Sequence, residues 1–180
     1  MSELVLVLGG ARSGKSTYAE SLAAQCGGDD VAYLATMVAD PTDPEIQRRV
    51  AGHRDRRPAT WRTLEHPALT MESIGQLQEK VVLLDCLSGF VSNIVLTRED
   101  DGEEKILAAV REEVDQLLTA VGGLSSTVVV VSNEVGMGIV PAYPLGRWFR
   151  DALGEANQQV AAQADRVVYV VAGLPMALKG

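Results

Sequence analysis

The chain has 180 residues, of which 47% are hydrophobic, enough for one well-buried core but few for two domains. It carries 16 Lys and Arg against 24 Asp and Glu, and the formal net charge of −8 argues against a nucleic-acid-binding surface. No apolar run approaches the roughly 20 residues that cross a bilayer, and no targeting leader precedes Leu4. We therefore expect a single domain over residues 1–180, a cytoplasmic location, and neither nucleic acid nor membrane as a partner.

Short apolar runs rich in valine recur along the chain and predict strands. They are continuously apolar rather than alternating, which is typical of strands buried on both faces of a parallel sheet. The runs are LVLVL (4–8), VAYLA (31–35), VVLLD (81–85), TVVVVS (127–132) and RVVYVVA (166–172). WRTLE (61–65) predicts an extra short strand.

Helical patterns lie between these runs. The predicted helices cover residues 17–26, 44–57, 87–96, 103–121 and 145–164. Asp43 and Pro44 are a helix start signal for the second of them, and Pro58 closes it. Strands that alternate with helices predict an α/β fold, in which helices cover both faces of a mostly parallel sheet.

The segment GGARSGKST lies between the first predicted strand and the first predicted helix, and it fits the phosphate-binding loop pattern. Its glycines let successive backbone N–H groups point at phosphate oxygens, and the helix N-terminus adds its positive end. Lys15 would bridge the β- and γ-phosphates, while the Ser16 hydroxyl would help to hold Mg²⁺. The predicted nucleotide-binding residues here are Gly9, Gly10, Ala11, Arg12, Ser13, Gly14, Lys15 and Ser16. The loop predicts a P-loop NTPase-type (RecA-like) α/β fold that binds a nucleoside triphosphate.

Asp85 ends the apolar run at 81–85 and is the predicted partner of Ser16 in a Mg²⁺ site. Proteins of this class place a metal-side carboxylate at the C-terminal end of a buried strand. The sequence lacks the Asn-Lys-x-Asp loop that reads guanine in GTPase switches, and residues 132–135 (SNEV) follow a strand without the Lys or the Asp. The loop and Asp85 therefore predict a bound nucleotide without saying what happens to it.

Six segments, taken in order, give a more specific resemblance. They are GGARSGKS (9–16), YLAT (33–36), HRDRRPATWRTLE (53–65), LLDCLSGFVSN (83–93), NEVGMGIVP (133–141) and FRDALGEANQQVAAQADRVVYVVAG (149–173). Together they resemble the bifunctional adenosylcobinamide kinase/adenosylcobinamide-phosphate guanylyltransferase family of cobalamin biosynthesis, over nearly the whole chain. Many unrelated enzymes share a phosphate loop, whereas NEVGMGIVP together with the His-x-x-x-Arg-Pro segment is highly specific.

The resemblance implies two activities. In this family an NTP (ATP or GTP) first phosphorylates the aminopropanol hydroxyl of adenosylcobinamide. GTP then guanylylates a histidine, and the GMP passes to the phosphorylated corrinoid, which gives adenosyl-GDP-cobinamide and releases pyrophosphate. The implied cofactor is Mg²⁺, ATP and GTP are substrates, and the implied assembly is a homotrimer.

The family's nucleophilic histidine corresponds to His53. The residues alone favour a surface or capping role for a single histidine near a helix end, so this role rests on the resemblance. A neutral imidazole can attack the α-phosphorus and form a phosphoramidate that leaves readily in the next transfer. Arg54, Arg56 and Arg57 could neutralise charge on the α-phosphate. His66, the other histidine, matches no family position.

Further nucleotide contacts also follow from the resemblance. Glu65 corresponds to one of them; its carboxylate could accept hydrogen bonds from guanine N1–H and the exocyclic amine, which would select GTP over ATP. An exposed glutamate at a strand end is the alternative interpretation. The other implied contacts are Leu34, Ala35, Thr36, Arg54, Asp55, Arg56, Arg57 and Asp85.

Two other functions remain open from the sequence. An ordinary phosphate-loop kinase for another hydroxyl would use the loop and Asp85 but not His53. A recombinase-like ATP-dependent assembly or switch protein would use nucleotide to control oligomer contacts and would form no covalent nucleotide. Retention of label from α-labelled GTP after denaturation separates these functions.

Overall fold

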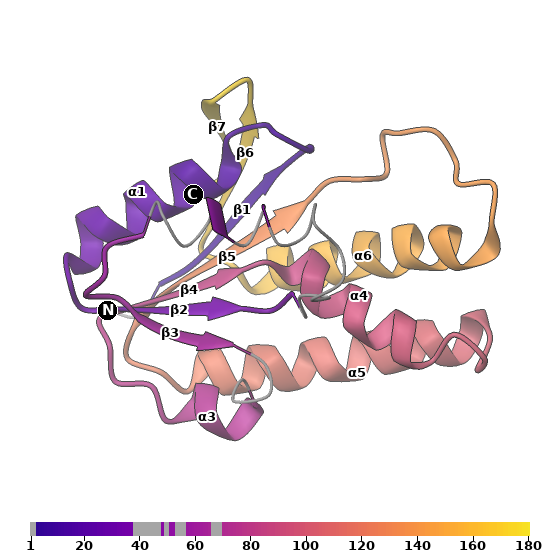
Figure 1. The fold of residues 1–180 in the computed structure, drawn as a ribbon, viewed down its shortest axis with the longest axis horizontal. Coiled ribbons are helices and arrows are strands. Elements are labelled where there is room, and N and C mark those ends of the chain that lie inside the picture. Colours follow the sequence, from indigo (N-terminus) through magenta and orange to yellow (C-terminus); the bar gives the residue numbers. More distant parts are fainter. Residues whose placement is uncertain (1–2, 38–47, 49–50, 53–56, 66–69) are drawn as a thin grey trace.

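A seven-stranded, mostly parallel sheet forms the centre of the fold (Figure 1). The computed structural model describes residues 3–37, 48, 51–52, 57–65 and 70–180. The strand order is β3-β2-β4-β5-β1-β6-β7, and every neighbouring pair is parallel except β6 and β7. The strands are β1 (Leu4–Gly9), β2 (Val31–Ala35), β3 (Arg62–Glu65), β4 (Val81–Asp85), β5 (Thr127–Asn133), β6 (Arg166–Val171) and β7 (Leu174–Lys179).

Helices lie between most of the strands up to β6; among the described elements β3 follows β2 directly, and α5 follows α4 directly. The described helices are α1 (Lys15–Gly27), α3 (Met71–Gly75), α4 (Leu87–Thr97), α5 (Glu103–Gly122) and α6 (Pro144–Gln163). Each apolar run that predicted a strand is a strand, and four of the predicted helices are present with ends shifted by at most two residues. The α/β fold with a mostly parallel sheet is therefore confirmed. The fifth predicted helix, at 44–57, lies largely outside the described residues.

Two elements were not predicted. Helix α3 begins with a capping box in which the Thr70 side chain accepts from the Ser73 N–H, and the Ser73 hydroxyl accepts from the Thr70 N–H. Strand β7 closes the chain as a hairpin on β6 instead of continuing the alternation. The turn consists of Ala172 and Gly173, whose φ angles are 51° and 81°, as a tight hairpin turn requires.

Helices cover the two faces of the sheet unequally. One face packs against α1 through Ala19 and Ala23, whose small side chains allow a close approach to valines of the central strands. The other face is covered by α3, α4, α5 and α6, which share a larger apolar core with β1, β2, β4 and β5. Figure 1 shows α1 on one side of the sheet and α4, α5 and α6 on the other. In the described part of the chain, no helix is long and apolar enough to cross a membrane.

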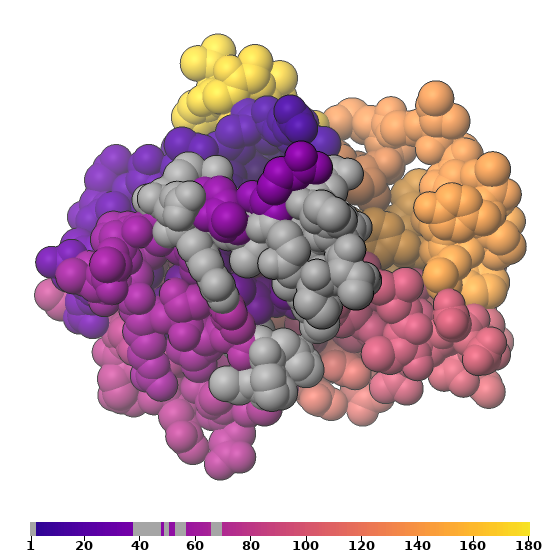
Figure 2. Space-filling view, in the orientation of Figure 1, coloured from indigo at the N-terminus to yellow at the C-terminus, as the bar shows by residue number. Residues whose placement is uncertain are grey.

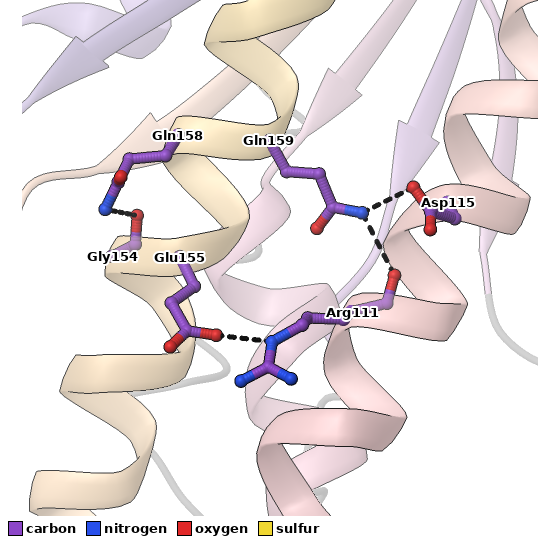
Figure 3. A network of polar contacts seen from close by, with 6 residues as sticks. All are labelled: Arg111, Asp115, Gly154, Glu155, Gln158 and Gln159. Atoms are coloured by element: carbon purple, nitrogen blue, oxygen red, sulfur yellow. Dashed lines mark hydrogen bonds and ion pairs between the residues drawn. The ribbon is translucent and has the colours of Figure 1, made fainter.

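Polar contacts hold α6 alongside α5 at the surface (Figure 3). Arg111 donates from Nε to Glu155 Oε2 at 2.8 Å, and one turn further along Gln159 donates to both Asp115 Oδ1 at 2.6 Å and the Arg111 carbonyl at 3.1 Å. These contacts are exposed and contribute little stability. The apolar core that α5 and α6 share is therefore the main reason why the two helices pack together.

A buried polar contact ties α6 to β5. The Ser132 hydroxyl donates to Asn157 Oδ1 at 2.6 Å, and Asn157 Nδ2 donates to the Asn133 carbonyl at 3.1 Å. Asn157 is only 7% exposed, so water cannot readily replace these partners. The contact lies at the carboxyl end of β5, beside the first strand and the loop that follows it.

We expect Asn157→Ala to lower the free energy of unfolding by about 1–3 kcal/mol, because it leaves the buried Ser132 hydroxyl and Asn133 carbonyl without partners. The matched control is Gln158→Ala on the exposed side of the same helix, where the side chain reaches only the Gly154 carbonyl at 3.5 Å (Figure 3). Urea unfolding of both variants measures the difference. Equal losses of stability would show that the buried contact has no special weight.

Candidate nucleotide site

The predicted phosphate loop lies between β1 and α1 and is held on both sides. The Gly9 carbonyl accepts from the Glu134 N–H at 3.1 Å, beyond the end of β5. The Ser13 carbonyl accepts from the Gly173 N–H at 2.7 Å, in the turn between β6 and β7. Because both neighbouring strands contribute a bond, the loop has a fixed position at the carboxyl edge of the sheet.

Two glycines meet clear structural demands in this loop. A Cβ on Gly9 would lie 2.4 Å from Ser13 Oγ and 2.8 Å from the Val170 carbonyl oxygen, so no side chain fits. Gly14 caps α1 with a φ of 92°, a conformation that L residues avoid. The Ser13 hydroxyl is buried and has no hydrogen-bond partner in the described structure, and a phosphate oxygen in the loop would supply one.

Lys15 folds back over the loop that it follows. Its Nζ donates to the Gly10 carbonyl at 3.2 Å, which places the ammonium group above the loop backbone. Burial lowers the pKa of Lys15, while the electrostatic influence of the end of β4, where Cys86 and Asp85 lie, acts in the opposite direction. The positive charge therefore lies within electrostatic reach of the end of β4, as a triphosphate site with a metal-side carboxylate requires.

The parallel sheet brings most of the remaining predicted residues to the same edge. In the strand register Ala35 of β2 is level with both Glu65 of β3 and Asp85 of β4, and Gly9 of β1 is level with Asn133 of β5. Since parallel strands all end on one side, the loop, Asp85 and Glu65 share this edge. Ligands of open α/β sheets bind at such an edge.

Asp85 is held by a tyrosine that the sequence did not single out. The Tyr33 hydroxyl donates to Asp85 Oδ2 at 2.8 Å, and the guanidinium carbon of Arg57 lies 3.8 Å from the centre of the Tyr33 ring. Burial, followed by the charge of Asp85 and this hydrogen bond, raises the pKa of Tyr33, so the hydroxyl keeps its proton and remains a donor. The tyrosine therefore connects a predicted metal ligand with a predicted nucleotide contact.

Thr36, a predicted nucleotide contact, also has a structural task. Its hydroxyl donates to the Cys86 carbonyl at 2.5 Å and accepts from the Cys86 N–H at 2.9 Å, across from β2 to β4. The Thr36 carbonyl accepts from Asn93 Nδ2 at 2.7 Å, which ties the same corner to α4. The Thr36 side chain is therefore fully engaged in holding the turn after Asp85.

The polar contacts continue from Cys86 along the sheet edge. Cys86 Sγ lies 2.9 Å from the Ser88 hydroxyl, and Asn133 Nδ2 donates to that hydroxyl at 2.8 Å. Burial is the main cause that raises the pKa of the Cys86 thiol, which is therefore neutral and unsuited to nucleophilic attack. Its place is structural.

A pocket of about 440 Å³ lies beside β3. It is lined by Arg57, Pro58, Ala59, Trp61, Thr63 and Glu65. Arg57 donates to the Thr63 hydroxyl at 3.3 Å, and the Trp61 indole donates to the Gly28 carbonyl at 3.0 Å. These hydrogen bonds hold two of the side chains that line the pocket. Glu65 is therefore one of the residues that line this pocket.

The other predicted contacts divide into two groups. Leu34 is fully buried in the core, so a nucleotide could reach only its backbone, while Ala35 is half-buried at the end of β2. His53, Arg54, Asp55 and Arg56 lie outside the described residues, as does His66. Tyr33, Ser88 and Asn133 were missed, and only the single polar tip inside the apolar run VAYLA could have drawn attention to Tyr33.

The residues present fit a Mg²⁺ ion of the phosphate-loop type. The described residues contain no group of three or more His, Cys, Asp or Glu side chains that could hold a metal by themselves. Mg²⁺ in nucleotide sites commonly uses one or two protein oxygens together with substrate phosphates and water. The Ser16 hydroxyl and the Asp85 carboxylate would supply those oxygens.

The loop after β1, the lysine over it and the carboxylate at the end of β4 define a phosphate-loop nucleotide-binding protein of the RecA-like fold class. A solved structure of a prototypical ATPase from the type III secretion system of pathogenic bacteria has the same fold, with a TM-score of 0.59 at 12% identity. The similarity covers 97% of this chain and 56% of that chain.

The chain belongs to the cobinamide kinase / cobinamide phosphate guanyltransferase family, whose model matches residues 5–178. It is 44% identical over 181 residues to the bifunctional adenosylcobalamin biosynthesis protein CobP of Pseudomonas aeruginosa, covering 97% of this chain and 96% of the relative. It is 40% identical over 184 residues to the bifunctional adenosylcobalamin biosynthesis protein CobU of Salmonella typhimurium, covering 98% and 99%. The predicted family and the predicted bifunctional enzyme class are therefore confirmed.

Proposed function

We propose that this enzyme phosphorylates adenosylcobinamide and then transfers GMP from GTP, through a guanylyl-histidine, to adenosylcobinamide phosphate. The observation that carries the proposal is the intact phosphate loop with Lys15 over it and Asp85 at the same edge of the sheet, in a chain that the family model matches over residues 5–178. The products would be adenosyl-GDP-cobinamide and pyrophosphate. ATP or GTP would serve the first step, and GTP the second.

In the kinase step, the substrate hydroxyl oxygen attacks the γ-phosphorus and releases a proton. The new O–P bond replaces the bond between the γ-phosphorus and the β,γ-bridging oxygen, which leaves with the nucleoside diphosphate. Lys15 and the N–H groups of the loop would stabilise the charge that develops on the phosphate oxygens. Mg²⁺, held by Ser16 and Asp85 when bound, would neutralise part of the triphosphate charge.

In the guanylyl step, an imidazole nitrogen of His53 attacks the α-phosphorus, and pyrophosphate leaves. The resulting phosphoramidate is then attacked by a phosphate oxygen of adenosylcobinamide phosphate, and the P–N bond breaks to regenerate the imidazole. Arg57, with Arg54 and Arg56, would offset negative charge on the α-phosphate. The role of His53 rests on the family resemblance and on this chemistry.

The pocket beside Glu65 would hold the guanine base. Its walls combine a carboxylate acceptor, a guanidinium group and a threonine hydroxyl with the apolar edge of Trp61. The guanine N1–H and exocyclic amine match a carboxylate, whereas adenine offers no such pair of donors. Base recognition by Glu65 would therefore explain a preference for GTP in the guanylyl step.

Glu65→Gln should weaken GTP binding by about ten- to a hundredfold, because a hydrogen bond to a charged group is worth roughly 1.5–3 kcal/mol. ATP binding should change much less. Equilibrium binding of both nucleotides measures the difference, with Glu72→Gln on the exposed surface of α3 as the control for loss of one negative charge. Equal effects of Glu65→Gln on the two nucleotides would remove it from base recognition.

His53→Ala should separate the two activities. The kinase step uses no protein nucleophile, so phosphorylation of adenosylcobinamide should persist. Incubation with α-labelled GTP should leave no acid-labile, alkali-stable label on the denatured variant.

Lys15→Ala should instead abolish both activities, since both need the triphosphate held in the loop.

His66→Ala is the matched control and should keep the label. Label on the His53→Ala variant would place the nucleophile elsewhere, with His66 as the remaining imidazole. A wild-type chain that phosphorylates its substrate but never retains label would support an ordinary phosphate-loop kinase. A wild-type chain with neither activity, whose oligomeric contacts respond to ATP, would support the assembly or switch protein.

We also propose that the chain forms a homo-oligomer, with the trimer implied by the family resemblance. The β6–β7 hairpin projects from the surface (Figure 2) and exposes Val171, Leu174, Met176 and Leu178, each by more than half. An apolar edge strand of this kind pairs readily with another chain unless it is covered. Leu178→Lys should therefore lower the molecular mass measured by analytical ultracentrifugation. Leu96→Lys, at an exposed site on α4, is the control and should leave this mass unchanged. A monomeric wild-type chain would contradict the proposal.

A further inference from the structure

The side chains of Arg57, Tyr33 and Asp85 form a continuous chain of contacts across three strands or their flanks. Arg57 precedes β3, Tyr33 is on β2 and Asp85 ends β4, which are neighbours in the sheet. The Arg57 guanidinium lies over one face of the Tyr33 ring at 3.8 Å, and the hydroxyl of that ring reaches Asp85 Oδ2 at 2.8 Å. Tyr33 as a whole is only 2% exposed.

The strand register explains why these groups meet. Ala35 is level with Asp85, and Tyr33 lies two residues before Ala35 on β2. Side chains two residues apart point to the same face of a sheet, so Tyr33 and Asp85 both project toward the face that α1 covers. The tyrosine side chain is long enough to reach diagonally from its place on β2 to the Asp85 carboxylate on β4. A phenylalanine at position 33 would fill the same space but could not donate a hydrogen bond.

This arrangement limits the freedom of the Asp85 carboxylate. A carboxylate at a strand end can rotate about two side-chain bonds and can swing toward any nearby cation. Here a buried neutral donor holds one of its oxygens, and the ring that carries this donor is itself packed against Arg57. The orientation of Asp85 therefore depends, through the Tyr33 ring, on the position of Arg57, the arginine of the His-x-x-x-Arg-Pro segment.

We propose that Tyr33 is a positioning residue that orients Asp85 for the metal–triphosphate complex and couples it to Arg57 of the guanylyl-transfer segment. The inference rests on the proposed function, because it gives Asp85 and Arg57 the roles assigned there. The hydroxyl of Tyr33 donates a hydrogen bond to the Asp85 carboxylate, and its ring packs against the Arg57 guanidinium. The two parts of one side chain can therefore be removed separately.

The test measures equilibrium binding of a fluorescent, non-hydrolysable GTP analogue as Mg²⁺ is varied, which needs no turnover. Tyr33→Phe keeps the ring and removes the hydroxyl, and should raise the Mg²⁺ concentration at half-saturation by about tenfold. Binding in EDTA should change by less than about twofold, because the loop itself is intact. Tyr169→Phe on β6 is the matched control and should behave as wild type.

A double-mutant cycle with Asp85→Asn separates positioning from general stability. In that background Tyr33→Phe should add less than about a twofold change, because the charged partner of the bond has gone. Tyr33→Leu, which also removes the ring, should slow formation of the GMP adduct at saturating Mg²⁺, whereas Tyr33→Phe should not. Thermal unfolding of each variant identifies any that fail to fold.

An unchanged Mg²⁺ dependence in Tyr33→Phe, or additive effects of Tyr33→Phe and Asp85→Asn, would overturn the inference. Equal rates of adduct formation in Tyr33→Leu and Tyr33→Phe would overturn the coupling to Arg57. A failure of the proposed function would look different, because the wild-type chain would then show no Mg²⁺-dependent nucleotide binding or no adduct.

Discussion

The position of the site depends on the parallel pairing of β1 with β5 on one side and β6 on the other. A phosphate loop must present its N–H groups while its own carbonyls find other partners. Here those partners come from the ends of both neighbouring strands, through the Glu134 N–H to Gly9 and the Gly173 N–H to Ser13. If either neighbour ran antiparallel, its carboxyl end would lie at the opposite edge, and the loop would lose a support.

A second set of contacts makes the edge rigid beyond the loop. The hydrogen bonds from Thr36 to Cys86, from Asn133 to Ser88 and from Asn157 to β5 join the ends of three strands to α4 and α6. All of these groups are wholly or partly buried, where a lost partner costs more than it does at the surface. Asp85 is thus held by two arrangements, Tyr33 at its carboxylate and Thr36 at the peptide that follows it.

Much of the fold could be predicted from sequence because buried parallel strands are continuously apolar and phosphate loops have a strict spacing. Two elements escaped for physical reasons: α3 uses serine where a capping box commonly has glutamate, and β7 is a wholly exposed strand that follows β6 after a two-residue turn, outside the alternation of strands and helices. In the site, the loop and Asp85 came from residues and spacing, whereas Glu65 and His53 needed the family resemblance. Tyr33 was missed because one hydroxyl inside an apolar run is visible only when the register of β2 and β4 is known.

The strand order also bears on how one chain could carry out two phosphoryl chemistries. The kinase step acts at the γ-phosphorus and the guanylyl step at the α-phosphorus. The residues proposed for the two steps should therefore be spread along the bound nucleotide. Glu65 on β3 lies four strands from β1, which is roughly 19 Å at about 4.8 Å per strand. Asp85 on β4 lies midway, two strands from each. A carboxylate in that position can act on a triphosphate that extends from the loop, while Tyr33 and Arg57 connect it to the pocket at the other end of the edge. The separation along the sheet therefore favours a shared central carboxylate over two independent sites.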